Sequence, residues 1–284
     1  MCCCTPLQQW RVKSILCIWP ILICILLTSA CVPLGSVLPW LGRQQDAYTG
    51  SALYKQASAY NWQQRDSLAL EWLLAGRVPS FMARFKKVEV SITDSASGNT
   101  IKAHYFVSPD YVSIGTDNDW ARLPLTPMAA QRLADSLHCF LPTRKMVDDI
   151  YQQATVKLEP MPMYAFRDST PTMYHHHLII EGQRRGRTGL IAGIKKDVVL
   201  SNKVLRDERP DRVAIYGWHK LDGKPIQPLY TGHVNWYVDY SHGIRLIQQT
   251  IYVNKRPMHY TEVLKHPVYH RLLCDEPSCD HFRY

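Results

Sequence analysis

The chain has 284 residues, of which 46% are hydrophobic and 20% charged, a composition typical of a folded globular protein and not of a disordered one. Its formal net charge of +9 at pH 7 suits an anionic envelope polymer or a membrane face. The charge is spread along the chain without a long Lys/Arg tract, so we expect no nucleic-acid partner.

The first thirty residues have the pattern of a targeting segment. Arg11 and Lys13 form a basic start, and the apolar run over residues 15–27 is shorter than the roughly 20 residues of a membrane-spanning helix. We therefore interpret residues 1–30 as a signal peptide. Small residues then lead into Cys31, which resembles the lipidation site of bacterial lipoproteins. Cleavage without lipidation and an uncleaved anchor are the alternatives, and all three place the body of the protein in the cell envelope, outside the cytoplasm.

Three cysteines lie beyond this segment. In an oxidising compartment Cys274 and Cys279 could close a short loop, which leaves Cys139 either as a buried apolar side chain or as a nucleophile. A zinc site built on these thiols would need further ligands, and the sequence offers little support for them. No cofactor is required by the sequence, and a divalent metal is kept as an alternative.

Residues 31–78 predict a tether followed by a helical preface. Glycines and a proline mark the tether, and apolar residues at helical spacing predict a helix from a cap at Asp66 to a stop at Gly76. We expect this helix to pack on the remainder, residues 79–284, which we interpret as a single domain.

Local signals in that domain predict both strands and helices. Residues 85–94 and 100–115 predict a hairpin that leads into a third strand. Two helices follow, the first capped by Thr126 with a proline at its first position and the second capped by Thr143. Residues 157–173 are rich in Pro and Met and predict a long loop.

Two charged or polar runs follow this loop. The three histidines at positions 175–177 predict a partly exposed polar run. Residues 190–202 predict an apolar strand whose charges indicate an edge or a solvent face. Because Lys196 shares a strand face with Ala192 and Ile194, it lies among apolar neighbours, and we expect it to hold an anionic group.

The predicted fold class is α+β. A mostly antiparallel sheet is expected from about Val88 to Val253, with two helices inserted after the third strand and helical pieces at both ends. Strand signals joined by hairpins, without regular βαβ alternation, argue against a doubly wound sheet.

Chemically capable side chains gather in residues 233–247, which predict a strand. Residues 212–230 place His219 on a second strand, whose return is marked by a turn at Asp222 and Gly223. We therefore predict that His219 and His233 converge on one solvent-accessible cleft. The candidate catalytic residues are His219, His233, Asp239, Ser241 and His242.

Two functions fit this cluster. The first is a hydrolase acting on an amide or glycan bond of cell-wall polymer, with His219 or His233 as base and Ser241 or a bound metal supplying the nucleophile. In a regular strand Asp239 and Ser241 would share a face that His242 does not, so His242 would be sterically poorly placed to activate Ser241, and the base would have to be His219 or His233. The alternative is a non-catalytic lipoprotein that binds glycan or peptide in an aromatic and basic cleft. Its candidate binding residues are Lys196, Trp218, Trp236, Tyr237, Tyr240 and Arg245.

Two resemblances accompany these patterns. Residues 241–246 (SHGIRL) resemble the motif of L,D-transpeptidases, Ser-His-Gly-Cys with an Arg one residue further on, but Ile244 stands in place of the catalytic cysteine. Arg245 follows Ile244 at once, one residue earlier than in the motif, and Ser241, His242 and Arg245 are the only positions to which the resemblance could carry a role. Sequence segments within roughly residues 105–276, among them RVAIYGWHKLDGKPIQPL and WYVDYSHGIRL, resemble segments of a group of secreted bacterial proteins of uncharacterised activity. This resemblance implies a single envelope domain and implies no activity.

Overall fold

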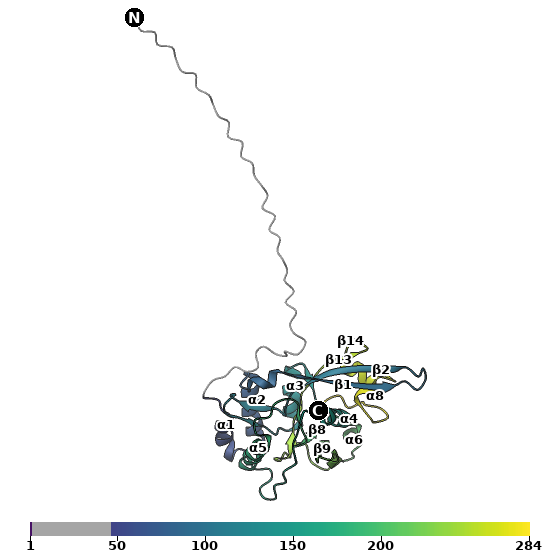
Figure 1. The fold of residues 1–284 in the computed structure, drawn as a ribbon. Coiled ribbons are helices and arrows are strands. Elements are labelled where there is room, and N and C mark those ends of the chain that lie inside the picture. The colour runs from purple at the N-terminus through teal and green to yellow at the C-terminus, as the bar shows by residue number, and fades with distance from the viewer. Residues whose placement is uncertain (2–46) are drawn as a thin grey trace. The chain divides into compact units, whose positions relative to one another are not determined.

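The computed structural model describes Met1 and residues 47–284 (Figure 1). The predicted signal peptide and the predicted lipidation site at Cys31 lie outside the described residues. The chain divides into a short unit, Met1–Pro33, and a compact unit, Leu34–Tyr284, and the fold below is that of the compact unit. None of the helices in residues 47–284 has the length and apolar character needed to cross a bilayer.

Two N-terminal helices, α1 (Gly50–Gln56) and α2 (Trp62–Leu74), pack onto the rest of this unit. Asn61 begins α2 through a capping box, one turn earlier than the Asp66 cap that the sequence suggests. Asp66 is instead buried inside the helix, where its carboxylate accepts the backbone N–H of Thr126 at 3.0 Å. The helical preface is therefore part of the main unit's core.

The larger sheet contains six strands in the order β14-β13-β2-β12-β5, with β1 paired to β2, and every pairing is antiparallel. The predicted hairpin is confirmed, since Lys86 pairs with Val107 at one end and Thr93 with Thr100 at the other. The strands are β1 (Lys86–Thr93), β2 (Thr100–Val107), β5 (Cys139–Phe140), β12 (Ile247–Gln248), β13 (Thr250–Val253) and β14 (Arg256–His259).

A second sheet has the order β10-β9-β8-β11, in which only β8 and β11 run parallel. Its strands are β8 (Lys196–Val198), β9 (Ile215–His219), β10 (Pro225–Tyr230) and β11 (His242–Gly243). Two short pairs complete the strands: β3 (Ser113–Gly115) with β4 (Trp120–Arg122), and β6 (Val156–Lys157) with β7 (Ile191–Ala192). The fold is α+β with mostly antiparallel sheets, as the sequence predicts.

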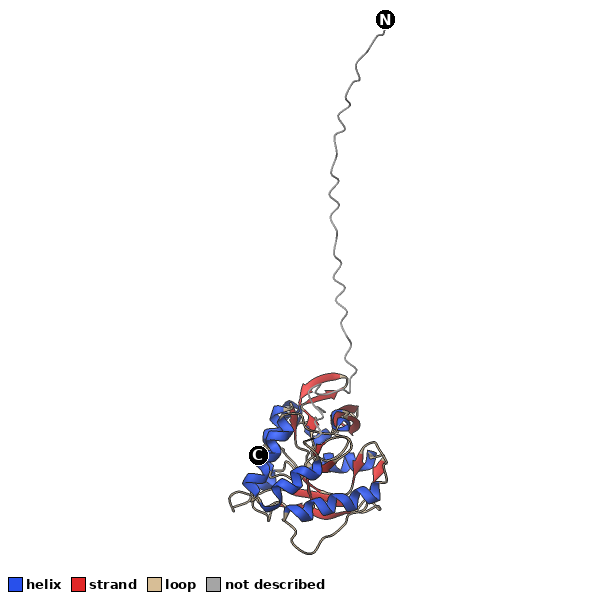
Figure 2. Cartoon of the chain, turned by 90° about the vertical axis from the view of Figure 1, so that its left-hand side faces the viewer, coloured by secondary structure: helices blue, strands red, loops and turns tan. Residues whose placement is uncertain are grey.

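Helices lie around both sheets (Figure 2). Thr126 and Thr143 cap α3 (Pro127–Ser136) and α4 (Arg144–Gln153), as the sequence predicts. The remaining helices are α5 (Thr170–Arg184), α6 (Asn202–Leu205), α7 (Tyr260–Lys265) and α8 (His270–Leu273).

Three expectations about the second sheet and its surroundings are wrong. The stretch over residues 233–247 is mostly loop, and β11 is only two residues long. Residues 195–197 are buried, because β8 lies between β9 and β11 and is not an edge strand. The three histidines lie in α5, where His175 is exposed, as expected of a partly exposed run, but His176 and His177 are buried.

Candidate functional site

A tight turn, and not a regular strand, presents the predicted catalytic residues. One carboxylate oxygen of Asp239 accepts the backbone N–H of Ser241 at 2.8 Å and its hydroxyl at 2.5 Å. The backbone N–H of His242 donates to the Asp239 carbonyl at 3.1 Å. The Asp239 side chain thus stabilises a turn by accepting hydrogen bonds from a residue two positions later, as Asp side chains commonly do. Because these residues form a turn, the argument that alternate strand residues face opposite sides, which placed His242 away from Asp239 and Ser241, does not apply.

The other carboxylate oxygen of Asp239 is also occupied. The guanidinium of Arg167 lies 3.0 Å from it, and the hydroxyl of Tyr237 donates to it at 3.3 Å. The Asp239 side chain is 0% exposed, whereas that of Arg167 is 44% exposed. Burial acts to raise the pKa of Asp239, but His242 and the hydrogen bonds from Ser241 outweigh it, and the pKa is lowered. Asp239 therefore stays ionised at neutral pH.

Two histidines lie side by side next to this turn. The imidazole centroids of His233 and His242 are 5.7 Å apart, and the Tyr237 ring lies 4.6 Å from that of His233. His242 is 1% exposed, and its Nε2 has no hydrogen-bond partner within the described part of the chain. Burial lowers the pKa of His242 to about 4, and burial also lowers the pKa of the half-buried His233. Both imidazoles are therefore neutral at pH 7.

Lys196 completes the cluster from the neighbouring strand. It pairs with His242 across the parallel β8–β11 ladder, so both side chains project from the same sheet face. Its ammonium lies 5.0 Å from the centroid of the Trp218 ring, and no residue within 47–284 gives it a hydrogen bond or an ion pair. Burial lowers the pKa of Lys196, and the charge of Asp239 opposes this effect.

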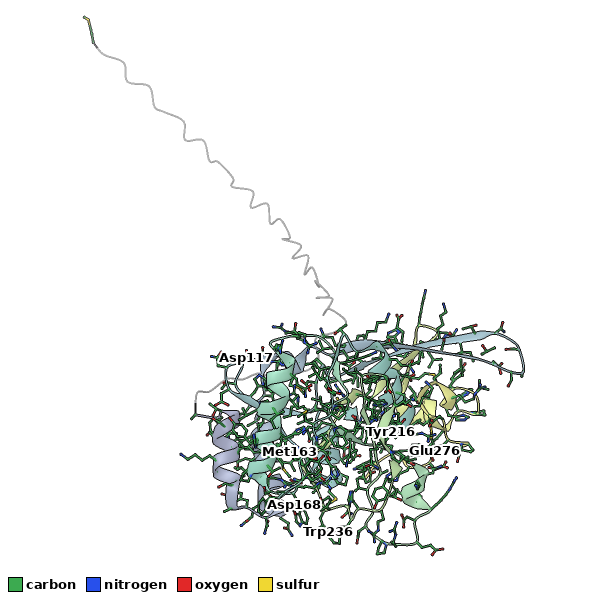
Figure 3. The ribbon with its side chains drawn as sticks, turned by 60° about the horizontal axis from the view of Figure 1, so that its bottom comes forward. Asp117, Met163, Asp168, Tyr216, Trp236 and Glu276 are labelled. Carbon is green, nitrogen blue, oxygen red and sulfur yellow. A yellow bond between two sulfur atoms is a disulfide. The ribbon has the colours of Figure 1, made fainter. Side chains whose placement is uncertain are left out.

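We call this group the His233 site; it comprises Arg167, Lys196, His233, Tyr237, Asp239 and His242. Trp236, which is 43% exposed, lies beside it in the chain. The charge of Asp168, which is labelled close to Trp236 in the view of Figure 3, acts on the pKa of Tyr237. Lys196, Asp239 and His242 of the site are therefore buried, and the exposed Trp236 directly precedes Tyr237 in the chain.

His219 is not part of this site, so the predicted convergence with His233 is wrong. The carbonyl of His233 accepts the N–H of Val213, which precedes His219 by six residues along an extended segment. The Nε2 of His219 lies 2.9 Å from a carboxylate oxygen of Asp148, to which the Tyr216 hydroxyl also donates at 2.9 Å. These residues line a separate open cavity of about 420 Å³, and Figure 3 shows Tyr216 apart from Trp236.

Three predicted site residues serve the fold instead of facing solvent. Arg245 is buried and donates to the carbonyls of Ser108 at 3.2 Å and Ile191 at 2.8 Å, so it is not placed to hold a ligand's acidic group. Tyr240 is 1% exposed, and its hydroxyl accepts the N–H of a loop residue. Ser241 is fully buried, and its hydroxyl donates to Asp239, which is a poor arrangement for a nucleophile.

Sequence reasoning missed two basic residues near the site. Arg167 lies in the loop before α5, and no local pattern connects it with Asp239. Lys195 is fully buried, where it donates to the carbonyl of Tyr240 and lies 3.3 Å from Nδ1 of His176. Burial lowers the pKa of Lys195 to about 7. The mid-strand position of Lys195 among apolar residues was the one signal that could have revealed it.

Among residues 47–284, no group of three or more His, Cys, Asp or Glu side chains is placed to hold a metal ion. Comparisons of the chain with protein-family models, curated proteins and solved structures found no match.

Proposed function

We propose that the protein is an exported cell-envelope protein that binds wall glycan or peptide at the His233 site. The ammonium group of Lys196 carries this proposal, since Lys196 is a buried residue, 7% exposed, whose charge has no carboxylate of its own in the described chain. Export, and attachment to the membrane through a lipid on Cys31 or an uncleaved anchor, are proposed from the N-terminal sequence pattern.

The charges of the site favour an acidic ligand. Asp239 already accepts hydrogen bonds from Ser241 and Tyr237 and forms an ion pair with Arg167. Its negative charge is therefore satisfied, and the positive charge of Lys196 remains for a carboxylate of a peptide or of an acidic wall sugar. Trp236 and Tyr237 offer ring surfaces against which an apolar part of the ligand can pack.

Binding of the purified full chain to isolated cell-wall sacculi tests this proposal. Lys196→Met keeps the length of the side chain and removes its charge, so we expect about 10-fold weaker binding or more, as a charge-assisted hydrogen bond contributes roughly 1.5–3 kcal/mol. Lys224→Met, at an exposed position of the β9–β10 turn, is the matched control and should bind like the unaltered protein. Equal binding by both variants would contradict the proposal.

Hydrolysis at the same site is a second candidate, favoured by the neutral state of His242 and its unbonded Nε2. An imidazole in this state can accept a proton from water, whereas the Ser241 hydroxyl is already committed to Asp239. In the same experiment a hydrolase would release soluble wall fragments, and His242→Asn would abolish their release. Binding without released fragments would eliminate the hydrolase and leave the binding function.

A further inference from the structure

A second surface with ligand-binding character lies on the larger sheet, away from the His233 site. The face formed by β1, β2 and β13 carries an open cavity of about 680 Å³. Figure 1 shows β1, β2 and β13 on the side of the compact unit opposite to β9. Residues Glu89, His104 and Tyr252 lie abreast on the three strands, because His104 pairs with both of the others. The lining of this cavity contains no residue of the His233 site.

Aromatic rings form the floor of the cavity. The rings of His104 and Tyr252 stack with centroids 4.7 Å apart and an interplanar angle of 6°. Phe106 meets both rings edge-on, with centroid distances of 5.8 and 6.4 Å. The core lies on the other face of β1 and β2, where Val88 and Tyr105 are buried. An outward sheet face usually carries polar side chains, whereas here the rings of His104 and Tyr252 line the cavity and the buried Phe106 packs against them from the core.

Lysines surround this aromatic floor. Lys87, Lys102 and Lys255 line the cavity, and Glu89 is the single acid among its lining residues. Glu89 forms an ion pair with Lys87, so its charge is already compensated. The ammonium groups of Lys102 and Lys255 have no carboxylate partner within residues 47–284. The cavity therefore has an excess of positive charge at its rim.

We propose that this β2–β13 face binds an acidic polysaccharide. The apolar face of a sugar ring packs on an aromatic side chain such as Tyr252, while carboxylate groups on the sugar accept hydrogen bonds from Lys102 and Lys255. A concave cavity of this size accommodates a few sugar units, whereas a bilayer surface would meet a flat or protruding face. The two exposed lysines also fall short of the long basic stripe with which proteins follow a nucleic-acid backbone.

The full chain in detergent micelles and immobilised polygalacturonate, a polymer of uronic acid, provide the test. The double variant Lys102→Glu and Lys255→Glu should bind at least 10-fold more weakly. Tyr252→Ala should weaken binding without changing the net charge. A second double variant, Lys220→Glu and Lys224→Glu, makes the same charge change at exposed positions of the β9–β10 turn and should retain binding.

Three outcomes would overturn the proposal: equal losses in the two double variants, undiminished binding by Tyr252→Ala, or equal binding of neutral dextran by the unaltered protein. Stronger binding to phosphatidylglycerol vesicles than to polygalacturonate, lost in Lys102→Glu and Lys255→Glu, would assign the face to lipid and would also overturn it. Lys196→Met should bind polygalacturonate normally on this face. The binding proposals for the His233 site and for the β2–β13 face are therefore tested independently of each other.

Discussion

His242 makes the folded protein sensitive to acid, because its imidazole is buried in the neutral form. Burial lowers the pKa of His242 to about 4, whereas a histidine of an unfolded chain titrates at about 6.5. As the pH falls below about 6.5 the unfolded state takes up a proton before the folded state does. The stability present above this pH is therefore lost progressively toward pH 4. Burial lowers the pKa of His176 and His177 as well, and both act in the same direction.

We predict that His242→Asn flattens this pH dependence. The free energy of unfolding of the unaltered protein, measured in urea, should fall between pH 6.5 and pH 5, at a rate of at most about 1.4 kcal/mol per pH unit for each buried histidine. The variant should be less stable at pH 7 but should lose less on acidification. The control is His175→Asn, which replaces an exposed histidine of α5. This variant should keep the pH dependence of the unaltered protein. An unchanged slope in His242→Asn would contradict this account.

The residues of the site were only partly predictable from the sequence. The density of His, Asp and Tyr in residues 233–247 is visible in the sequence, and it located four of the six residues of the His233 site. The apolar neighbours of Lys196 on its predicted strand face indicated a fifth, as a group that could hold an anion. The turn that Asp239 closes was not visible, because a regular strand was the simplest reading of the same residues. Arg167 was not visible either, since it meets Asp239 only through the tertiary fold.

At the scale of elements, β11 fits against its neighbours only because Gly243 has no side chain. A Cβ atom at this position would lie 2.5 Å from a ring carbon of Tyr111 and 2.6 Å from the Cβ of Lys195. Both distances are shorter than any ordinary contact between carbon atoms. The approach of β11 to β8, which places His242 beside Lys196, therefore depends on this glycine.

We predict that Gly243→Ala lowers the free energy of unfolding by roughly 1–3 kcal/mol, the usual cost of overpacking a core. Gly182→Ala is the matched control, because Gly182 lies within α5 and an added Cβ there meets no atom within 4 Å. It should raise the free energy of unfolding by about 0.5–1 kcal/mol through its better helix propensity. Urea unfolding of the two variants measures both values, and equal effects would refute the role given to Gly243.

Elements with strong local signals were predictable, and elements defined by tertiary contacts were not. The caps at Thr126 and Thr143 and the β1–β2 hairpin depend on neighbouring residues, so the sequence places them correctly. The charges of residues 195–197 indicated an exposed strand, whereas the fold buries β8 and gives Lys195 a carbonyl partner in Tyr240. Burial of a charge with a distant partner leaves no local pattern in the chain.

At the scale of the whole molecule, the C-terminal segment connects the second sheet with the helices near the larger one. The hydroxyl of Tyr284 accepts the N–H of Ala214 at 2.9 Å and donates to the carbonyl of Val199 at 2.7 Å. The Tyr260 hydroxyl of α7 donates to the carbonyl of Phe282 at 3.1 Å. A disulfide joins Cys274 to Cys279 where this segment begins, and Cys139 is free and buried. The pairing allowed by the sequence is thus confirmed.

We predict that reduction of this disulfide lowers the free energy of unfolding by about 2 kcal/mol, the value that loop-closure entropy gives for so short a loop. The double variant Cys274→Ser and Cys279→Ser should show the same loss without reductant and no further loss with it. Unfolding in urea with and without dithiothreitol measures the effect. Unchanged stability, with mass spectrometry confirming reduced thiols, would show that the segment is held by its other contacts alone.

The pairing of β2 also determines when the protein can fold. Val107 of β2 pairs with Ile247 of β12, and His104 pairs with Tyr252 of β13, so the centre of the larger sheet is assembled from distant parts of the chain. Contacts of such high sequence separation require the closure of long loops and slow the folding reaction. A partly synthesised chain that ends before residue 247 presents one edge of β2 without its partner. Such an edge recruits strands from other chains, and newly made protein therefore needs protection from aggregation until residues 247–253 have emerged.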